Sequence, residues 1–174
     1  MGAPGDVYER ELKSLLSGES KAIQKMIKTC SDQESDSYKK MLENPFVVIR
    51  AAGSLGVDLV ALRWDFSFPI EVKSSAEETM HFSRSQRLMD QAQNMKDECS
   101  RSHLIPIYAM RLKSFRGDPW RIFALPMDED LRGSMGLLQR KIPKIRLNEN
   151  GNYIMKWSEG MKLSDFLAYV SLNT

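Results

Sequence analysis

Two neighbouring stretches decide the fold of this chain: RAAGSLGVDLVA at residues 50–61 and PIEVK at residues 69–73. Both contain short apolar runs rich in β-branched residues, which are typical of strands. Residues two apart in a strand point to the same face, so Glu71 and Lys73 are expected side by side. Asp58 begins the preceding strand, and a hairpin would bring it beside Glu71. The sequence therefore predicts two carboxylates and one ammonium group at the ends of adjacent strands.

Converging carboxylates are a typical site for a hard cation such as Mg²⁺, which prefers oxygen ligands. Lys73 beside them would orient or help deprotonate a water molecule, and the metal would stabilise charge that develops on a phosphate. This combination suits phosphodiester hydrolysis. Two simpler interpretations stay open: Glu71 and Lys73 can form a solvated strand face, and Asp58 can close a Gly-x-Asp turn. The Glu-x-Lys spacing alone decides nothing, because the chain contains it three times.

A further carboxylate, Glu9, lies in an N-terminal stretch with the apolar spacing of a helix. On that helix Glu9 shares a face with Leu12 and Leu16. A carboxylate on the core side of a helix is expected to be paired, metal-bound or at the rim of a site. Asp6-Val-Tyr-Glu9 also fits a capping box, in which Asp6 is the N-cap and Glu9 reaches back to its backbone. The residues leave both roles open.

The rest of the pattern predicts one α/β domain over residues 1–174 with the core order α-β-β-β-α-β-β. Residues 17–44 are expected to form two helices, separated by a polar loop at 31–37. Later strands are expected at 105–110 and 120–125, after a helix near 83–100. Beyond Pro126, the remaining segments are less regular, and we expect a hairpin around 148–151 and a terminal helix at 164–170.

The composition fits a soluble globular domain, with 174 residues, 42% apolar and 28% charged. A net charge of +2 neither requires nor excludes a nucleic-acid partner, but residues 111–174 carry 11 basic and 7 acidic side chains. Within them Arg140, Lys141 and Lys144 are candidates to follow a DNA backbone, or form a solvated face. Two cysteines outside any C-x-x-C pair argue against a disulfide framework and a structural zinc. Without a membrane-length apolar run or a secretory signal, we expect a cytoplasmic protein with no membrane partner.

Four segments, in the correct order, resemble the archaeal-type Holliday junction resolvases of the PD-(D/E)xK nuclease superfamily. They are YEREL at 8–12, VIRAAGS at 48–54, VDLVA at 57–61 and IEVK at 70–73. IPIYA at 105–109 and PWRIF at 119–123 are similar to the last two strands of that family. The resemblance implies a restriction-endonuclease-like fold, with a mixed central β-sheet flanked by helices. Residues 17–44 would then be a helical insert and residues 126–174 a C-terminal extension.

The insert has two possible interpretations. It can be a surface-packed decoration, because insertions in surface loops are well tolerated, or it can change the junction-binding or dimer surface. The sequence does not choose between them.

The resemblance also implies roles for individual residues. It assigns catalysis to Glu9, Ser54, Asp58, Glu71 and Lys73, metal binding to Glu9, Asp58, Glu71 and the Val72 carbonyl, and phosphate contacts to Arg10 and Arg50. The implied activity is paired nicking of a four-way DNA junction by a homodimer with Mg²⁺, for which Mn²⁺ can substitute, and without a small-molecule cofactor. The alternatives are a PD-(D/E)xK nuclease with another DNA substrate, of restriction or repair type, and a non-catalytic DNA-binding module on the same fold.

Overall fold

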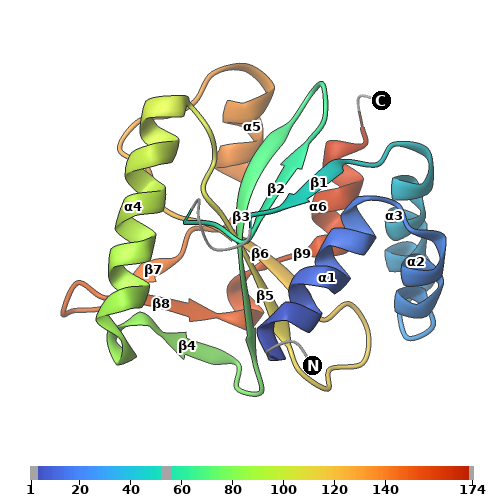
Figure 1. Cartoon of the computed structure of the whole chain (residues 1–174), viewed down its shortest axis with the longest axis horizontal. Coiled ribbons are helices and arrows are strands. Elements are labelled where there is room, and N and C mark those ends of the chain that lie inside the picture. The colour runs from blue at the N-terminus through green and yellow to red at the C-terminus, as the bar shows by residue number, and fades with distance from the viewer. Residues whose placement is uncertain (1–3, 52–55, 173–174) are drawn as a thin grey trace.

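The computed structural model describes residues 4–51 and 56–172 and shows a mixed α/β fold (Figure 1). Its helices are α1 (Pro4–Leu16), α2 (Ser20–Ile27), α3 (Asp32–Glu43), α4 (Gln86–Ser102), α5 (Gly133–Lys141) and α6 (Leu163–Val170), with short 3₁₀ turns η1 (Phe82–Arg84) and η2 (Trp157–Glu159). Its strands are β1 (Val47–Arg50), β2 (Leu59–Leu62), β3 (Ser67–Ser75), β4 (Thr79–His81), β5 (Ile107–Leu112), β6 (Trp120–Ala124), β7 (Arg146–Leu147), β8 (Tyr153–Lys156) and β9 (Met161–Lys162). A central mixed sheet flanked by helices agrees with what the family resemblance implies.

The central sheet has the strand order β1-β2-β3-β5-β6-β9. Neighbouring strands run antiparallel, except that β3 and β5 are parallel and are joined through α4. The hairpin predicted between β2 and β3 is present, with Leu59 opposite Ile70. Asp58, the residue before β2, therefore lies beside Glu71 of β3. The start of β2 and the middle of β3 bring together the residues of the predicted site.

Helices cover both faces of this sheet (Figure 1). On one face Ile70 and Val72 of β3 belong to the larger apolar core, which includes Leu12 and Leu15 of α1. On the other face Tyr108 of β5 belongs to a second core with residues of α4. The alternation of side chains along a strand sends Glu71 to the α4 face, between two residues that face α1.

Among the described residues, no helix combines the length and apolar character that a bilayer crossing needs.

Residues 17–44 form two helices that pack into the main core. Ile23 of α2 and both Tyr38 and Met41 of α3 are buried there. The prediction of a loop at residues 31–37 is wrong, because α3 begins at Asp32. Ser31 caps α3 in a reciprocal capping box: its hydroxyl accepts from the Glu34 N–H, and Glu34 accepts from the Ser31 N–H. The polar residues that suggested a loop instead form the cap and first turns of the helix.

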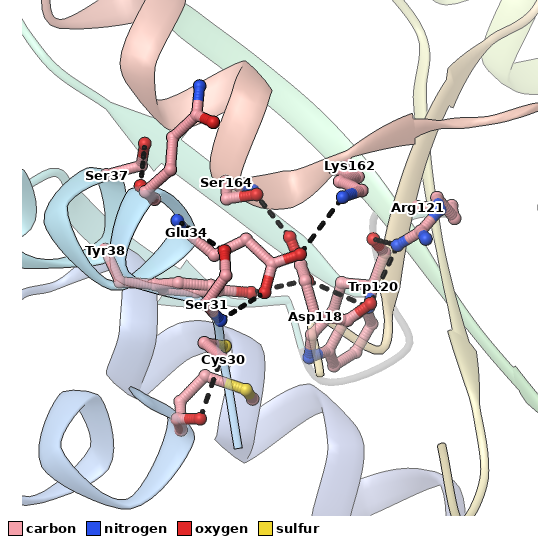
Figure 2. Close-up of polar contacts among 12 residues, drawn as sticks. Cys30, Ser31, Glu34, Ser37, Tyr38, Asp118, Trp120, Arg121, Lys162 and Ser164 are labelled. Atoms are coloured by element: carbon pink, nitrogen blue, oxygen red, sulfur yellow. Dashed lines mark hydrogen bonds and ion pairs between the residues drawn. The ribbon is translucent and has the colours of Figure 1, made fainter. Parts of the chain in front are cut away.

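Asp118 joins three elements at the start of β6 (Figure 2). Its carboxylate accepts hydrogen bonds from the Tyr38 hydroxyl of α3 at 2.8 Å and from the Ser164 N–H of α6 at 2.8 Å. The Trp120 N–H donates to the same carboxylate at 3.2 Å. Burial raises the pKa of Asp118, while these donors lower it. One buried acid therefore connects residues 17–44 to the sheet and the C-terminal helix.

The segment after Pro126 contributes strands to the central sheet and to a second, smaller sheet. The hairpin predicted around residues 148–151 is present as β7 and β8, and the terminal helix as α6. A second small sheet with the order β4-β8-β7 was not expected, because β4 and β8 are far apart in the sequence. Helix α5 was also not predicted.

β1 is an edge strand of the central sheet, and its apolar residues are not all buried, although a short β-branched apolar run is typical of a buried strand. Val48 faces the core, whereas Val47 is 66% and Ile49 49% exposed. Leu62 lies opposite Val47 on β2 and is also exposed, and Trp64 in the following turn is 84% exposed. Since α4 covers β3 and β5 rather than β1, this hairpin presents an apolar outer face.

Candidate active site

Asp58, Glu71 and Lys73 come together where β2 begins beside β3. The Val72 N–H donates to Asp58 Oδ2 at 2.7 Å, and the Asp58 N–H donates to the Ile70 carbonyl at 3.1 Å. These two bonds fix the position of the Asp58 side chain against β3. The Lys73 ammonium donates to Glu71 Oε1 at 2.7 Å. Glu71 is only 2% exposed, so the alternative that it belongs to a solvated strand face is wrong.

Glu71 is an unusually weak acid in this setting. Its pKa is raised from 4.5 to about 7, chiefly by burial and additionally by the nearby Asp58 charge, although Lys73 acts in the opposite direction. Lys73 therefore does not compensate fully for the loss of hydration. In the metal-free protein, Glu71 therefore keeps its proton to a higher pH than an ordinary carboxyl group does. Binding of a cation at this carboxylate would release that proton.

Glu9 faces this cluster from α1. The helix begins at Pro4, so Asp6 lies within its first turn and is not the N-cap. The capping-box interpretation of Glu9 is therefore wrong. The Glu9 carboxylate instead accepts a hydrogen bond from Arg50 at 3.0 Å. Burial and the nearby charge of Asp58 raise the pKa of Glu9, and Lys73 lowers it, as expected for a carboxylate next to the cluster.

The arginines predicted to contact phosphates lie at the rim, on α1 and at the end of β1. Arg50 forms ion pairs with both Asp6 and Glu9, and Arg10 pairs with Asp6 at 2.7 Å. Both cations already have acidic partners, which DNA phosphates would have to replace. Ser54 lies outside the described residues.

The donor set fits a magnesium ion through two of its carboxylates. Oε2 of Glu71 is buried and has no hydrogen-bond partner among the described residues, although the Asp58 carboxylate lies beside it. A buried carboxylate oxygen without a donor is costly unless a cation satisfies it. Mg²⁺ is usually held by one or two carboxylates together with water and substrate phosphates.

No group of three Asp, Glu, His or Cys side chains within residues 4–51 and 56–172 is arranged to hold a metal. Glu9 and the Val72 carbonyl therefore stay predicted ligands, beside a pair formed by Asp58 and Glu71.

Sequence reasoning missed two polar residues on α1 and α4. Gln91 of α4 lies beside Lys73, with its Oε1 3.4 Å from the ammonium nitrogen. The sequence could have indicated Gln91, because it is a polar residue one turn from Leu88 and Met95 on the apolar face of that helix. Glu11 accepts hydrogen bonds from Arg111 at 2.8 Å and from the Trp120 indole at 2.9 Å. These bonds attach α1 to the sheet two residues after Glu9.

The predicted basic run lies on other elements, at the end of α5 and just after it. The Lys144 ammonium donates to the main-chain carbonyls of Gln139 and Ile142, and burial lowers its pKa. Lys141 is placed over the Tyr169 ring of α6, with its ammonium 5.3 Å from the ring centre. Arg140 is exposed. Lys144 thus has an internal structural role, and DNA contacts by these three residues stay a prediction.

Comparison with known proteins finds similarity among solved structures. No family model matches the chain, and no curated protein sequence matches it. Among solved structures, Hjc of Archaeoglobus fulgidus, a Holliday junction resolvase from an archaeal hyperthermophile, is similar, with a TM-score of 0.53 and 17% sequence identity. The match covers 95% of this chain and 97% of that one. The central sheet, its helices and the segments beyond them thus together have the fold of a Holliday junction resolvase.

Proposed function

We propose that this protein is a metal-dependent endonuclease that resolves four-way DNA junctions by paired nicking. The observation that carries the proposal is the buried Glu71 carboxylate, with one oxygen on Lys73 and the other without a partner, next to Asp58. This constellation lies in a chain with the resolvase fold over nearly its whole length. A degenerate, non-catalytic module would have little reason to keep an acid that is costly to bury.

Each residue of the cluster has a role that follows from its position. Asp58 is fixed by the Val72 N–H, and Glu71 by Lys73, so both carboxylates are oriented before substrate arrives. Asp58 and Glu71 would hold a magnesium ion, which would supply stabilisation of the charge that develops on the phosphate. The Lys73 ammonium orients the water that attacks phosphorus. As the water bonds to phosphorus it releases a proton to solvent, the bond to the 3′ oxygen breaks, that oxygen takes up a proton from solvent, and 5′-phosphate and 3′-hydroxyl ends remain.

The substrate would be held at the rim by Arg10 and Arg50. Phosphates would take the place of Asp6 as the partner of both cations, and Glu9 would remain between Arg50 and the carboxylate pair. A four-way junction has two-fold symmetry, and a two-fold symmetric homodimer presents one such site to each of two equivalent strands. We therefore include the homodimer in the proposal.

A cleavage assay tests the activity. The full chain is incubated with Mg²⁺ and either a four-way junction or linear duplex of the same sequence. Glu71→Gln removes the acidic ligand, and Glu77→Gln makes the same change at a carboxylate that is largely exposed in the turn after β3. We expect symmetric paired nicks in the junction with the parent and with Glu77→Gln, and a loss of at least a hundredfold in rate with Glu71→Gln.

Other outcomes identify the alternatives. Equal cleavage of linear duplex would indicate a nuclease of the same superfamily with another DNA substrate. Tight junction binding without cleavage by the parent, with either Mg²⁺ or Mn²⁺, would contradict the enzymatic proposal and support a binding module.

A further inference from the structure

Tyr108, in the middle of β5, has a hydroxyl that the fold leaves unused. The side chain is completely buried, and its hydroxyl has no hydrogen-bond partner among residues 4–51 and 56–172. The ring is held in place by Phe82, whose ring centre is 5.7 Å away and which itself packs on Tyr153. Phenylalanine would make the same ring contacts without placing a polar atom in this apolar core. A tyrosine here therefore needs another explanation than packing.

The residue paired with Tyr108 on the neighbouring strand is Glu71. Tyr108 and Glu71 are direct register partners on the parallel strands β5 and β3, so both side chains point to the α4 face. Burial and then the Glu71 charge raise the pKa of the Tyr108 hydroxyl, which places the two groups within electrostatic reach. The hydroxyl therefore stays protonated. Among the described residues it is a donor without an acceptor, and Oε2 of Glu71, on the paired strand, is an acceptor without a donor.

We propose that Tyr108 is a positioning residue for Glu71, and that its hydroxyl donates a hydrogen bond to Oε2 when a divalent cation is bound. This inference rests on the proposed metal-dependent function. Oε1 is already held by Lys73, and Oε2 has two lone pairs, one for a cation and one for a donor. Carboxylates that bind metals are commonly held by such donors, and these bonds often tighten only in the loaded site.

The experiment compares two tyrosines that are equally buried. Tyr108→Phe removes the hydroxyl next to Glu71, and Tyr38→Phe removes the one bonded to Asp118. Mn²⁺ binding to the full chain without DNA is measured by electron paramagnetic resonance, and Mg²⁺ binding by calorimetry. We expect Tyr108→Phe to bind both cations at least tenfold more weakly than the parent, and Tyr38→Phe to bind them within twofold of the parent.

Thermal unfolding in EDTA separates positioning from a structural role. Tyr38→Phe should lower the melting temperature, because it removes a formed hydrogen bond. Tyr108→Phe should leave it unchanged or raise it, because the lost hydroxyl had no partner in the metal-free protein. In junction cleavage, Tyr108→Phe should change two quantities by different factors. The factor by which it raises the Mg²⁺ concentration at half-maximal rate should exceed the factor by which it lowers the maximal rate.

A third variant tests the donor itself. 4-Aminophenylalanine at position 108 keeps a donor at the same ring position and should bind cations within threefold of the parent, which keeps the test valid even if Tyr108→Phe does not fold. Parent-like cation affinity in Tyr108→Phe, or a tenfold loss in the 4-aminophenylalanine variant, would overturn the inference while leaving the proposed function in place. Failure of the parent to bind either cation would overturn both.

Discussion

At the scale of single residues, Glu71 links the stability of the fold to the chemistry of the site. Its pKa of about 7 in the folded protein lies above the ordinary 4.5, chiefly because of burial. An acid with a raised pKa contributes stability that is fully present below 4.5 and is lost as the pH rises through about 7. The metal-free protein therefore loses stability on the alkaline side, where the site has to be ionised to bind a cation.

The first prediction concerns this pH dependence. Between pH 4 and pH 8, the free energy of unfolding of the metal-free parent should fall by about 3 kcal/mol relative to that of Glu71→Gln. This value follows because each tenfold change in proton affinity corresponds to about 1.4 kcal/mol. Urea unfolding in EDTA at several pH values measures it, with Glu77→Gln as the control. Parallel pH profiles for the parent and Glu71→Gln would show that Glu71 is not the titrating group.

A second prediction at this scale concerns metal addition. Because the cation needs ionised Glu71, Mg²⁺ should raise the melting temperature of the parent more at pH 8 than at pH 6. The same addition should have little effect on Glu71→Gln at either pH. A stabilisation that did not depend on Glu71 would indicate a cation site elsewhere.

The sequence was enough to predict the grouping of Asp58, Glu71 and Lys73, because strand periodicity and a hairpin between adjacent strands are local properties. Tyr108 could not be placed next to Glu71 in the same way. Its register depends on the parallel pairing of β3 with β5 across a helix of 17 residues, and local spacing carries no information on that alignment.

At the scale of elements, α3 shows how tertiary contacts override a polar sequence. The sequence suggested a loop because seven consecutive polar residues begin at Ser31. The capping box of Ser31 and Glu34 begins a helix there, and Tyr38 one turn later fixes that helix to Asp118. Similarly, β1 has the composition of a buried strand but lies at an edge, and only the order of strands in the sheet determines that.

The prediction at this scale concerns the bond between α3 and the sheet. Tyr38→Phe should lower the free energy of unfolding by about 2 kcal/mol, since it removes a buried hydrogen bond to a carboxylate and leaves the ring in place. Chemical denaturation of both proteins at pH 7 measures the difference. A change below about 0.5 kcal/mol would mean that solvent or another donor replaces the tyrosine hydroxyl.

At the scale of the whole molecule, the apolar outer face of the β1–β2 hairpin provides a surface for the proposed homodimer. An unpaired edge strand with exposed apolar side chains readily pairs with a second copy, and antiparallel pairing of two β1 strands would be two-fold symmetric. Val47 and Leu62 lie opposite each other at one end of the β1–β2 pairing. The proposed substrate and a dimer paired through this edge would share the same two-fold symmetry.

We expect the parent to have a solution mass of twice its chain mass of 19.9 kDa. Val47→Lys should shift it toward the monomer, because a charge at the edge opposes strand pairing. Light scattering measures the mass, and Glu77→Lys serves as a control at an exposed position away from this hairpin. Paired nicking should decline with the dimer, whereas a parent that is monomeric with the junction bound would contradict this assembly.

The unequal burial of the tryptophans gives the protein built-in optical probes. Trp120 is enclosed and its indole nitrogen is bonded to Glu11, while Trp64 stands in water beside the β1–β2 hairpin. Emission from Trp64 should therefore lie at the red end of the spectrum and be quenched readily by iodide. Self-association through that hairpin would move its emission to shorter wavelengths, whereas the emission of Trp120 would change only when the domain unfolds. Fluorescence from a single unlabelled chain can thus follow assembly and folding as separate events.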